Sequence, residues 1–323
     1  MTRNAVVLTV LVMAVVTAIV ANRPAGAPNE PPESAYAALA DTPAAPPDAI
    51  RGPDASTGSF TVECGRNERG HRNTDNVVTS PGYVGGAHHT HDYVGNTTTS
   101  ALSTDAGLAA GSTTCAGGDR SAYFWPVLRR LDREGSDARA HGGGRHGNTG
   151  EIVVASAVRI AYLGNPVGKV IPQPAGLRMI TGDPVAATTT TEHVRARWGC
   201  STDPGRHTAT RYVRCPSGSG VTRTLDFPSC WNGLHPDSPN HRGHIVHPDG
   251  AGICPPATFP VPRLRITLVY DLPEGAGFAV DSFPEQKRDP MTDHAMFVGA
   301  LPDRDRARIA ECVNQGRHCR ATP

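Results

Sequence analysis

The chain has 323 residues, a formal net charge of +1 at pH 7 and 19% charged side chains. This balance excludes the basic excess with which proteins neutralise nucleic acid or an anionic membrane surface. The 35 glycines and 29 prolines favour short elements joined by turns.

Residues 1–22 have the pattern of an export signal. Arg3 precedes an unbroken apolar run from Ala5 to Ala21, which is a positively charged n-region followed by an h-region. Cleavage after Ala21 or within residues 25–27 would release the chain. An uncleaved anchor is the alternative, because the run is only just short of a transmembrane helix. We expect a secreted protein, or one held at the outer face of the cytoplasmic membrane, whose only membrane contact is this segment.

Residues 23–58 are rich in Pro, Ala, Gly and Asp and contain few large apolar side chains. Such a stretch buries too little surface to offset its chain entropy, so the composition predicts a disordered linker. One folded domain is then expected over residues 59–323. That length is large for a single domain but acceptable for an all-β one.

Strand patterns dominate the predicted domain. Short runs that are β-branched or alternate between apolar and polar residues occur at 151–162, 194–200, 211–215, 221–227 and 263–270. One helix is predicted over residues 303–315, with Asp303 as its N-cap and Gly316 at C′. Many short strands in one unit indicate an all-β fold, a β-sandwich or jelly-roll-like domain.

The eight cysteines are scattered singly and form no C-x-x-C pair. In an exported chain this arrangement indicates disulfides rather than a zinc site, although spacing alone leaves the connectivity open. We favour sequential pairing, because it closes short loops between neighbouring elements. The pairs would be Cys64–Cys115, Cys200–Cys215, Cys230–Cys254 and Cys312–Cys319, and each would stabilise the fold by about 2–4 kcal/mol.

His89 and His91 form an H-x-H pair within residues 81–96. On a strand, side chains at i and i+2 leave the same face, so two imidazoles would lie side by side. Such a pair can bind a divalent metal or act as acid and base. The alternative is a pair of polar histidines at the rim of the fold.

A second histidine-bearing segment covers residues 227–248 and contains His241, His244 and Asp237. Pro, Gly, Asn and Ser are frequent there and Cys230 would pin it, so we expect an ordered loop that presents groups to a site. A surface loop without a ligand is the alternative. His294, near the end of the chain, is alone in sequence, where a histidine is more often structural.

Other candidates could contact a sugar. Arg178 and Asp183 could form a buried ion pair or bind hydroxyls, whereas Tyr123, Trp125 and Trp231 could stack on sugar rings or pack in the core. No G-x-S-x-G elbow, P-loop, H-E-x-x-H or Rossmann glycine pattern occurs.

Taken in order, these segments resemble domain of unknown function nineteen-ninety-six, an exported family of actinobacteria and fungi. The matching motifs lie at residues 89–96, 113–115, 119–126, 176–183, 198–200, 215–216, 227–244, 254–255 and 294–297, so the resemblance spans about residues 60–319. It implies a β-sandwich and export but no settled activity. Asn232 and Met296 stand where the family usually has Asp, and Gly243 and His247 where it has Ser and an aromatic residue. These departures favour a site centred on histidines, or a member without catalysis.

Three functions follow as hypotheses. The first is a carbohydrate-active hydrolase or lyase that acts on a cell-wall or environmental polysaccharide. Its candidate catalytic residues are His89, His91, His241, His244, His294 and Asp183, with Asp92 and Asp237 in reserve, and its candidate substrate-binding residues are Arg178, Tyr123, Trp125 and Trp231.

The second hypothesis is a metal-binding protein that holds Zn or Cu, since imidazole suits both metals. The ligands would be His89, His91 and His244, or His241 or His294 in place of His244. The third is a non-catalytic module that binds cell-wall glycan. In each case we expect a monomer.

Overall fold

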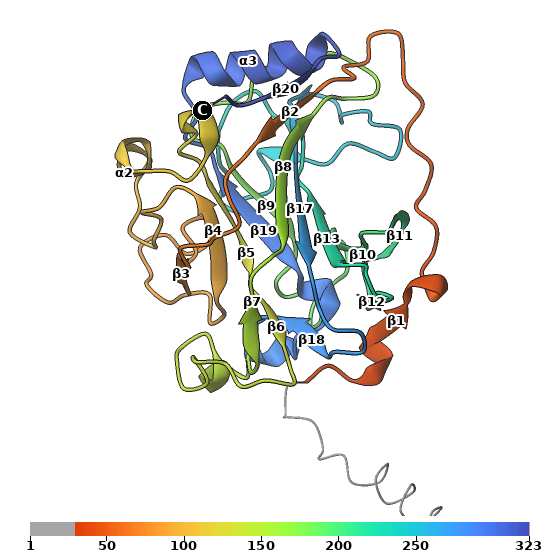
Figure 1. Ribbon diagram of the computed structural model, residues 1–323. Coiled ribbons are helices and arrows are strands. Elements are labelled where there is room, and N and C mark those ends of the chain that lie inside the picture. Colours follow the sequence, from red (N-terminus) through yellow and green to blue (C-terminus); the bar gives the residue numbers. More distant parts are fainter. Residues whose placement is uncertain (1–29, 323) are drawn as a thin grey trace, which may run out of the picture.

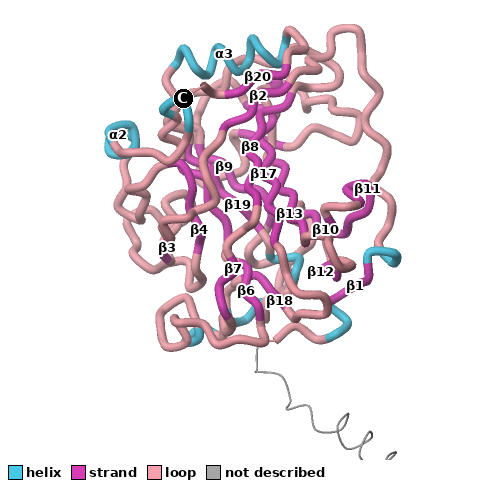
Figure 2. Tube along the Cα trace, in the orientation of Figure 1, coloured by secondary structure: helices cyan, strands magenta, loops and turns pink. Residues whose placement is uncertain are grey.

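The computed structural model describes residues 30–322, and the expected export segment at residues 1–22 lies outside this range. Strands in several sheets form the regular structure, so the predicted all-β class is confirmed (Figures 1 and 2). The largest sheet has seven strands, in the order β11 (Asp203–Thr208), β10 (Arg197–Cys200), β13 (Val221–Asp226), β17 (Arg263–Tyr270), β8 (Ala157–Leu163), β2 (Ser59–Val62) and β20 (His318–Arg320).

A second sheet has five strands and runs beside the first. Its order is β3 (Arg72–Asn73), β4 (His91–Gly95), β5 (Ala122–Pro126), β19 (His294–Val298) and β9 (Arg178–Gly182). Every pairing within it is antiparallel. Strands β4 and β19, on either side of β5, therefore run parallel to each other and begin at the same end of the sheet.

Three smaller sheets complete the fold. They contain β18 (Phe278–Val280), β6 (Leu128–Arg130) and β7 (Glu151–Val153); β15 (Ile245–Val246), β14 (Cys230–Trp231) and β16 (Phe259–Pro260); and β1 (Tyr36–Ala38) with β12 (Tyr212–Arg214). The α-helices are α2 (Asp105–Ala110) and α3 (Asp303–Asn314), and short 3-10 helices lie at Glu33–Ala35, Leu39–Asp41, Ala116–Gly118, Gly144–His146, Pro284–Gln286 and Pro290–Thr292.

One hydrophobic core lies between the two large sheets. Strand β17 alternates so that Leu264, Ile266 and Leu268 are fully buried. They belong to the same cluster as Trp125 and Phe297 from the five-stranded sheet. The period of two that predicted this strand is thus the period of its burial.

The predictions for individual elements were partly right. Strand β17 has the predicted bounds, whereas the single strand expected at 151–162 is divided into β7 and β8, which belong to different sheets. Helix α3 is confirmed, with Gly316 at φ 68° just beyond its end. Its N-cap is Pro302 rather than Asp303, which lies in the first turn.

The prediction of a disordered linker over residues 23–58 was wrong for the part that the structure describes. Strand β1 pairs in parallel with β12, and the Tyr36 hydroxyl donates to the Phe278 carbonyl at 2.6 Å. Residues 43–55, here called the strap, then run along one side of the molecule to β2 (Figure 1). The buried ring of Tyr36, backbone pairing and a hydrogen bond from Arg206 to the Thr42 carbonyl supply order that the composition did not predict.

All four predicted disulfides are present: Cys64–Cys115, Cys200–Cys215, Cys230–Cys254 and Cys312–Cys319. Four such bonds are typical of proteins that fold in an oxidising, extracellular compartment. Among residues 30–322, no helix combines the length and the apolar character needed to cross a bilayer.

Candidate functional site

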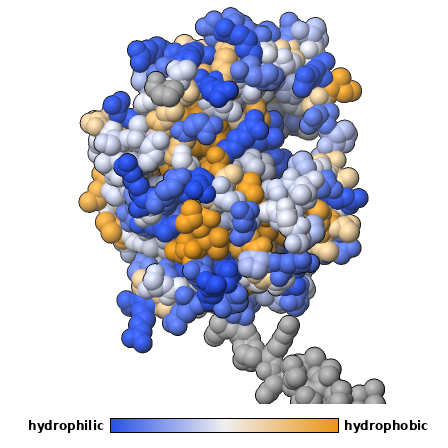
Figure 3. All heavy atoms as spheres, viewed as in Figure 1, coloured by the Kyte–Doolittle hydropathy of each residue, from blue (hydrophilic) through white to orange (hydrophobic). Residues whose placement is uncertain are grey.

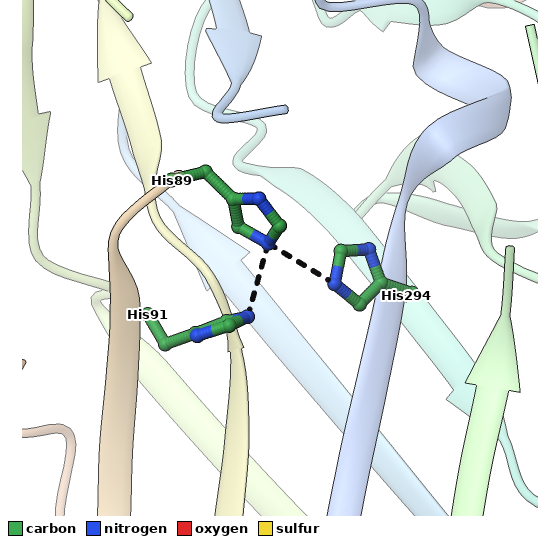
Figure 4. Close-up of side chains that lie close together, drawn as sticks. All are labelled: His89, His91 and His294. Carbon is green, nitrogen blue, oxygen red and sulfur yellow. Dashed lines mark hydrogen bonds between the residues drawn. The ribbon is translucent and has the colours of Figure 1, made fainter. Parts of the chain in front are cut away.

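Three histidines meet at the end of the five-stranded sheet where strands β4 and β19 begin. His91 is the first residue of β4, His294 is the first residue of β19, and His89 lies in the turn before β4. Because β4 and β19 run parallel, their first residues lie at the same end of the sheet and their side chains can converge. The three rings point toward one another in Figure 4.

The Nε2 atoms of the three rings lie close together. His89 Nε2 lies 3.1 Å from His91 Nε2 and 3.3 Å from His294 Nε2. One ligand atom from each ring falls within 4.8 Å of both others. All three side chains are buried, with exposures of 0–1%. We call this group the histidine trio.

Backbone carbonyls fix the tautomer of two members of the trio. His91 Nδ1 lies 3.0 Å from the Asp75 carbonyl and His294 Nδ1 lies 2.8 Å from the Thr292 carbonyl. A carbonyl oxygen only accepts, so each Nδ1 donates its hydrogen. In the neutral ring each Nε2 then carries a lone pair that points into the trio.

The third ring, His89, is held differently. A contact with the backbone of Ala87 acts to raise the pKa of His89. Within the described residues, however, no hydrogen bond of normal geometry reaches the buried Nδ1 of this ring. If the hydrogen of His89 is on Nε2, it can bond to the lone pair of His91 Nε2 or of His294 Nε2, but not well to both. The trio therefore contains more acceptors than donors.

Burial keeps the trio uncharged. Desolvation lowers the pKa of His91 to about 4. Desolvation, together with repulsion from His91, lowers the pKa of His294 to about 3. The pKa of His89 is also lowered well below its ordinary value, by burial first and then by the two neighbouring rings. Neutral imidazoles are ready to donate a lone pair without first losing a proton.

Three carboxylates near the trio are paired with arginines. Asp293 forms a fully buried pair with Arg223, and Asp281, which also accepts from the Thr90 N–H, pairs with Arg129. Asp92, a reserve carboxylate of the hydrolase hypothesis, contacts Arg72 Nε at 2.6 Å. These side chains hold the edge of the sheet together, and none is free to act as a base.

A loop over residues 137–150 closes over the turn that carries His89. Asp137 anchors one end of the loop to Arg129, whose Nη2 lies 2.6 Å from its carboxylate. Buried Asn148 donates to the carbonyls of Gly142 and Ser282. A Cβ on Gly142 would lie 2.1 Å from Thr74 and 3.3 Å from the backbone of His89. The contact is tight enough to require glycine, and it keeps the trio away from bulk water.

The other candidate histidines lie elsewhere. His244 bonds through Nδ1 to Ser238 and through Nε2 to the Arg178 carbonyl at 2.7 Å. In β9, Gly182 is the partner of His294, and Arg178 lies four residues away, about 13 Å along the strand. The expectation that His244 joins His89 and His91 was wrong, because backbone and hydroxyl groups already occupy both of its nitrogens.

His241 also lies outside the trio. Its Nδ1 contacts the Asp237 carboxylate at 2.9 Å within the same loop. Arg178 pairs with Asp105 of α2 at 2.7 Å, not with Asp183. Asp183 instead accepts from the Val185 N–H in its own turn. The candidate catalytic and substrate-binding residues therefore do not form one site.

Two of the three candidate sugar-stacking residues belong to the core. Trp125 and Tyr123 are 1% and 0% exposed, and the Tyr123 hydroxyl donates to Asp119 at 2.6 Å. Neither ring can stack on a sugar at the surface. Trp231 is half-buried and its Nε1 donates to the His235 carbonyl, so part of its ring is still accessible.

Some residues that shape the site were not predicted. The carbonyls of Asp75 and Thr292 act through the backbone, which no side-chain motif reveals. Phe283, whose ring lies 5.0 Å from that of His89 at an edge-to-face angle, comes from a segment without any recognisable pattern. His294 is one of the predicted candidates, and its place in the family motif at residues 294–297 was the available signal.

Comparison with known proteins gives a family but no activity. No curated protein and no solved structure matches the chain significantly. One family model matches residues 75–298, a range that contains the whole trio and the Asp75 and Thr292 carbonyls. The chain therefore belongs to the family described as domain of unknown function DUF1996.

Proposed function

We propose that this chain is an exported metal-binding protein whose His89, His91 and His294 hold one Zn or Cu ion. The observation that carries the proposal is the convergence of three buried Nε2 atoms within 4.8 Å. Zn and Cu both accept imidazole nitrogen as a ligand. The four disulfides and the apolar run at residues 5–21 support secretion.

The separations between the nitrogens support metal binding. Zn–N bonds of about 2.0–2.1 Å at tetrahedral angles place two ligand nitrogens about 3.3 Å apart. In the structure His89 Nε2 lies 3.1 and 3.3 Å from the other two nitrogens, and all three fall within 4.8 Å of one another. Little movement of the rings is needed to admit an ion, and the excess of lone pairs in the trio would be relieved by a cation.

The outer contacts also have the character of a metal site. Histidines that bind metals commonly donate their second N–H to a carbonyl or carboxylate, which fixes ring orientation. His91 and His294 do this toward the Asp75 and Thr292 carbonyls. With three protein ligands, a fourth position would remain for water or a substrate, as in catalytic zinc sites.

This geometry favours metal binding over acid–base catalysis on a polysaccharide. The trio is buried beneath the 137–150 loop, and an extended polymer could not reach it without movement of that loop. The reserve carboxylate Asp92 is paired with Arg72. A glycosidase would need two accessible carboxyl groups across the scissile bond.

Elemental analysis of protein purified without a His-tag tests the proposal. We expect about one Zn or Cu per chain after loading and dialysis. His294→Ala should weaken binding by more than the roughly 10- to 100-fold that loss of an outer contact costs, whereas His318→Ala, at an exposed histidine in β20, should have no effect. Metal well below one per chain in the folded wild type, after exposure to both ions, would overturn the proposal.

A further inference from the structure

A channel lies between the strap and the outer face of the seven-stranded sheet. The strap is fixed at both ends, since Ala45 N–H donates to the Gly205 carbonyl and Gly52 N–H to the Pro166 carbonyl. In the described chain, residues 46–51 make no backbone hydrogen bond to the rest of the protein. They form an arch, and Figure 3 shows an open gap near the edge along which the strap runs in Figure 1.

The space beneath the arch is long and narrow. One cavity of about 530 Å³ reaches from His207 of β11 to β17, and a second of about 290 Å³ continues to Gly58, just before β2. They share Asp48, Arg263 and Arg265, so they form one channel. It crosses the sheet from β11 to β2, which at about 4.8 Å per strand is about 24 Å.

Arginines from the sheet form the floor of this channel. Arg197 and Arg265 both hold the Asp226 carboxylate, each at 2.6 Å. Arg263 is held less closely, because its Nε lies 3.9 Å from Asp226 and forms no hydrogen bond in the described chain, while 34% of its side chain is exposed. The exposed part of this guanidinium can therefore donate to an acceptor that arrives from outside.

The acidic groups of the channel do not fill this role. Asp249 accepts from the N–H groups of Ala251 and Ile253 and so stabilises its own turn. Asp48, on the strap, interacts electrostatically with Arg263 and Arg265, but within residues 30–322 it forms no ion pair within 4.0 Å. Arg51 lines the channel from the strap as a further cation.

The remaining walls are mixed, with polar side chains such as Asn165, Thr224 and Thr267 beside apolar groups. Five prolines line the larger cavity: Pro46, Pro47, Pro166, Pro204 and Pro248. The proline rings suit the C–H faces of sugar rings, and the polar side chains beside them can bind sugar hydroxyls. The length of the channel likewise fits a linear polymer better than a single small molecule.

We propose that this channel binds an extended anionic glycan, with a carboxylate or phosphate oxygen of the glycan paired to Arg263. A guanidinium presents parallel N–H groups that match either oxyanion. This site is separate from the histidine trio, and it does not depend on the proposed metal.

Calorimetric titration of the purified protein with three probes tests the proposal. We expect binding of an oligogalacturonate that weakens as NaCl is added, and at least tenfold weaker binding of its neutral methyl ester. Oligomeric glycerol phosphate distinguishes the source of the oxyanion: tighter binding of this probe identifies phosphate, and weaker binding identifies carboxylate.

Variants connect the binding to the channel. Arg263→Gln should weaken binding of the preferred probe roughly 10- to 100-fold. Arg159→Gln is the matched control, because Arg159 is exposed on neighbouring β8 but does not line the channel, and it should change affinity less than twofold. Arg51→Gln, on the strap, provides a second test if Arg263→Gln does not fold. Failure of every anionic probe to bind, or equal binding by wild type and folded channel variants, would overturn the proposal.

Discussion

Acidification of the metal-free protein should destabilise it through the histidine trio. Burial holds the pKa of His91 at about 4 and that of His294 at about 3 in the folded chain, against an ordinary value of 6.5. As the pH falls below 6.5, the unfolded chain takes up protons that the folded chain does not. Stability is therefore lost between pH 6.5 and about 3, and the loss levels off below that range.

The magnitude follows from these values. Between pH 7 and pH 5, each of the two groups removes about 2 kcal/mol from the free energy of unfolding, or about 4 kcal/mol together. The pKa of His89 is shifted in the same direction, so it adds to the loss. Typical domains are stable by about 5–15 kcal/mol, so the effect should be large.

Urea unfolding at pH 7 and pH 5, with a chelator present, measures this loss. The matched variant carries His91→Asn and His294→Asn, since the Asn amide nitrogen lies near the position of Nδ1. It can still donate to the Asp75 and Thr292 carbonyls but does not titrate. The variant should lose about 4 kcal/mol less than wild type over this interval. Equal losses in the two proteins would refute the assigned burial of the trio.

Three further substitutions test other parts of the structure by their free energies of unfolding. Replacing Cys230 and Cys254 together by Ala should cost about 2–4 kcal/mol, and an unchanged urea midpoint would contradict a stabilising role for this disulfide. Arg129→Met should cost about 3–5 kcal/mol, because buried Asp281 would keep, as its ion pair, only the longer, 4.0 Å contact with Arg288; a neutral effect would mean that Asp281 is solvated. Trp125→Ala should cost about 3–5 kcal/mol through a core cavity without altering glycan affinity, and selective loss of glycan binding would instead support the stacking role.

Local patterns were sufficient for several features of the fold. Strand β17 has the predicted bounds because one of its faces contacts the core and the other faces outward. The disulfides follow the order of the cysteines because each pair closes a loop between neighbouring segments, with separations of 7 to 51 residues. For β17 and for three of the four disulfides, with separations of 7 to 24 residues, the information lies within a short stretch of chain.

The features that could not be predicted depend on contacts between residues that are distant in the sequence. The strand at Tyr36 forms because its ring meets Tyr212 and Phe278, and nothing in the composition of residues 23–58 indicates those partners. The H-x-H motif likewise predicted only two of the three clustered histidines. The choice of His294 rather than His244 depends on the parallel course of β4 and β19, which is a property of the sheet order.

The separation of the trio along the chain has a consequence for biosynthesis. His89 and His294 are 205 positions apart, and no disulfide joins the segments that carry them, so β19 must add to β5 before the three rings can meet. If the chain crosses a membrane unfolded, as the proposed export requires, it has no such site before it crosses. The ion available where folding is completed would then decide which metal the proposed site receives.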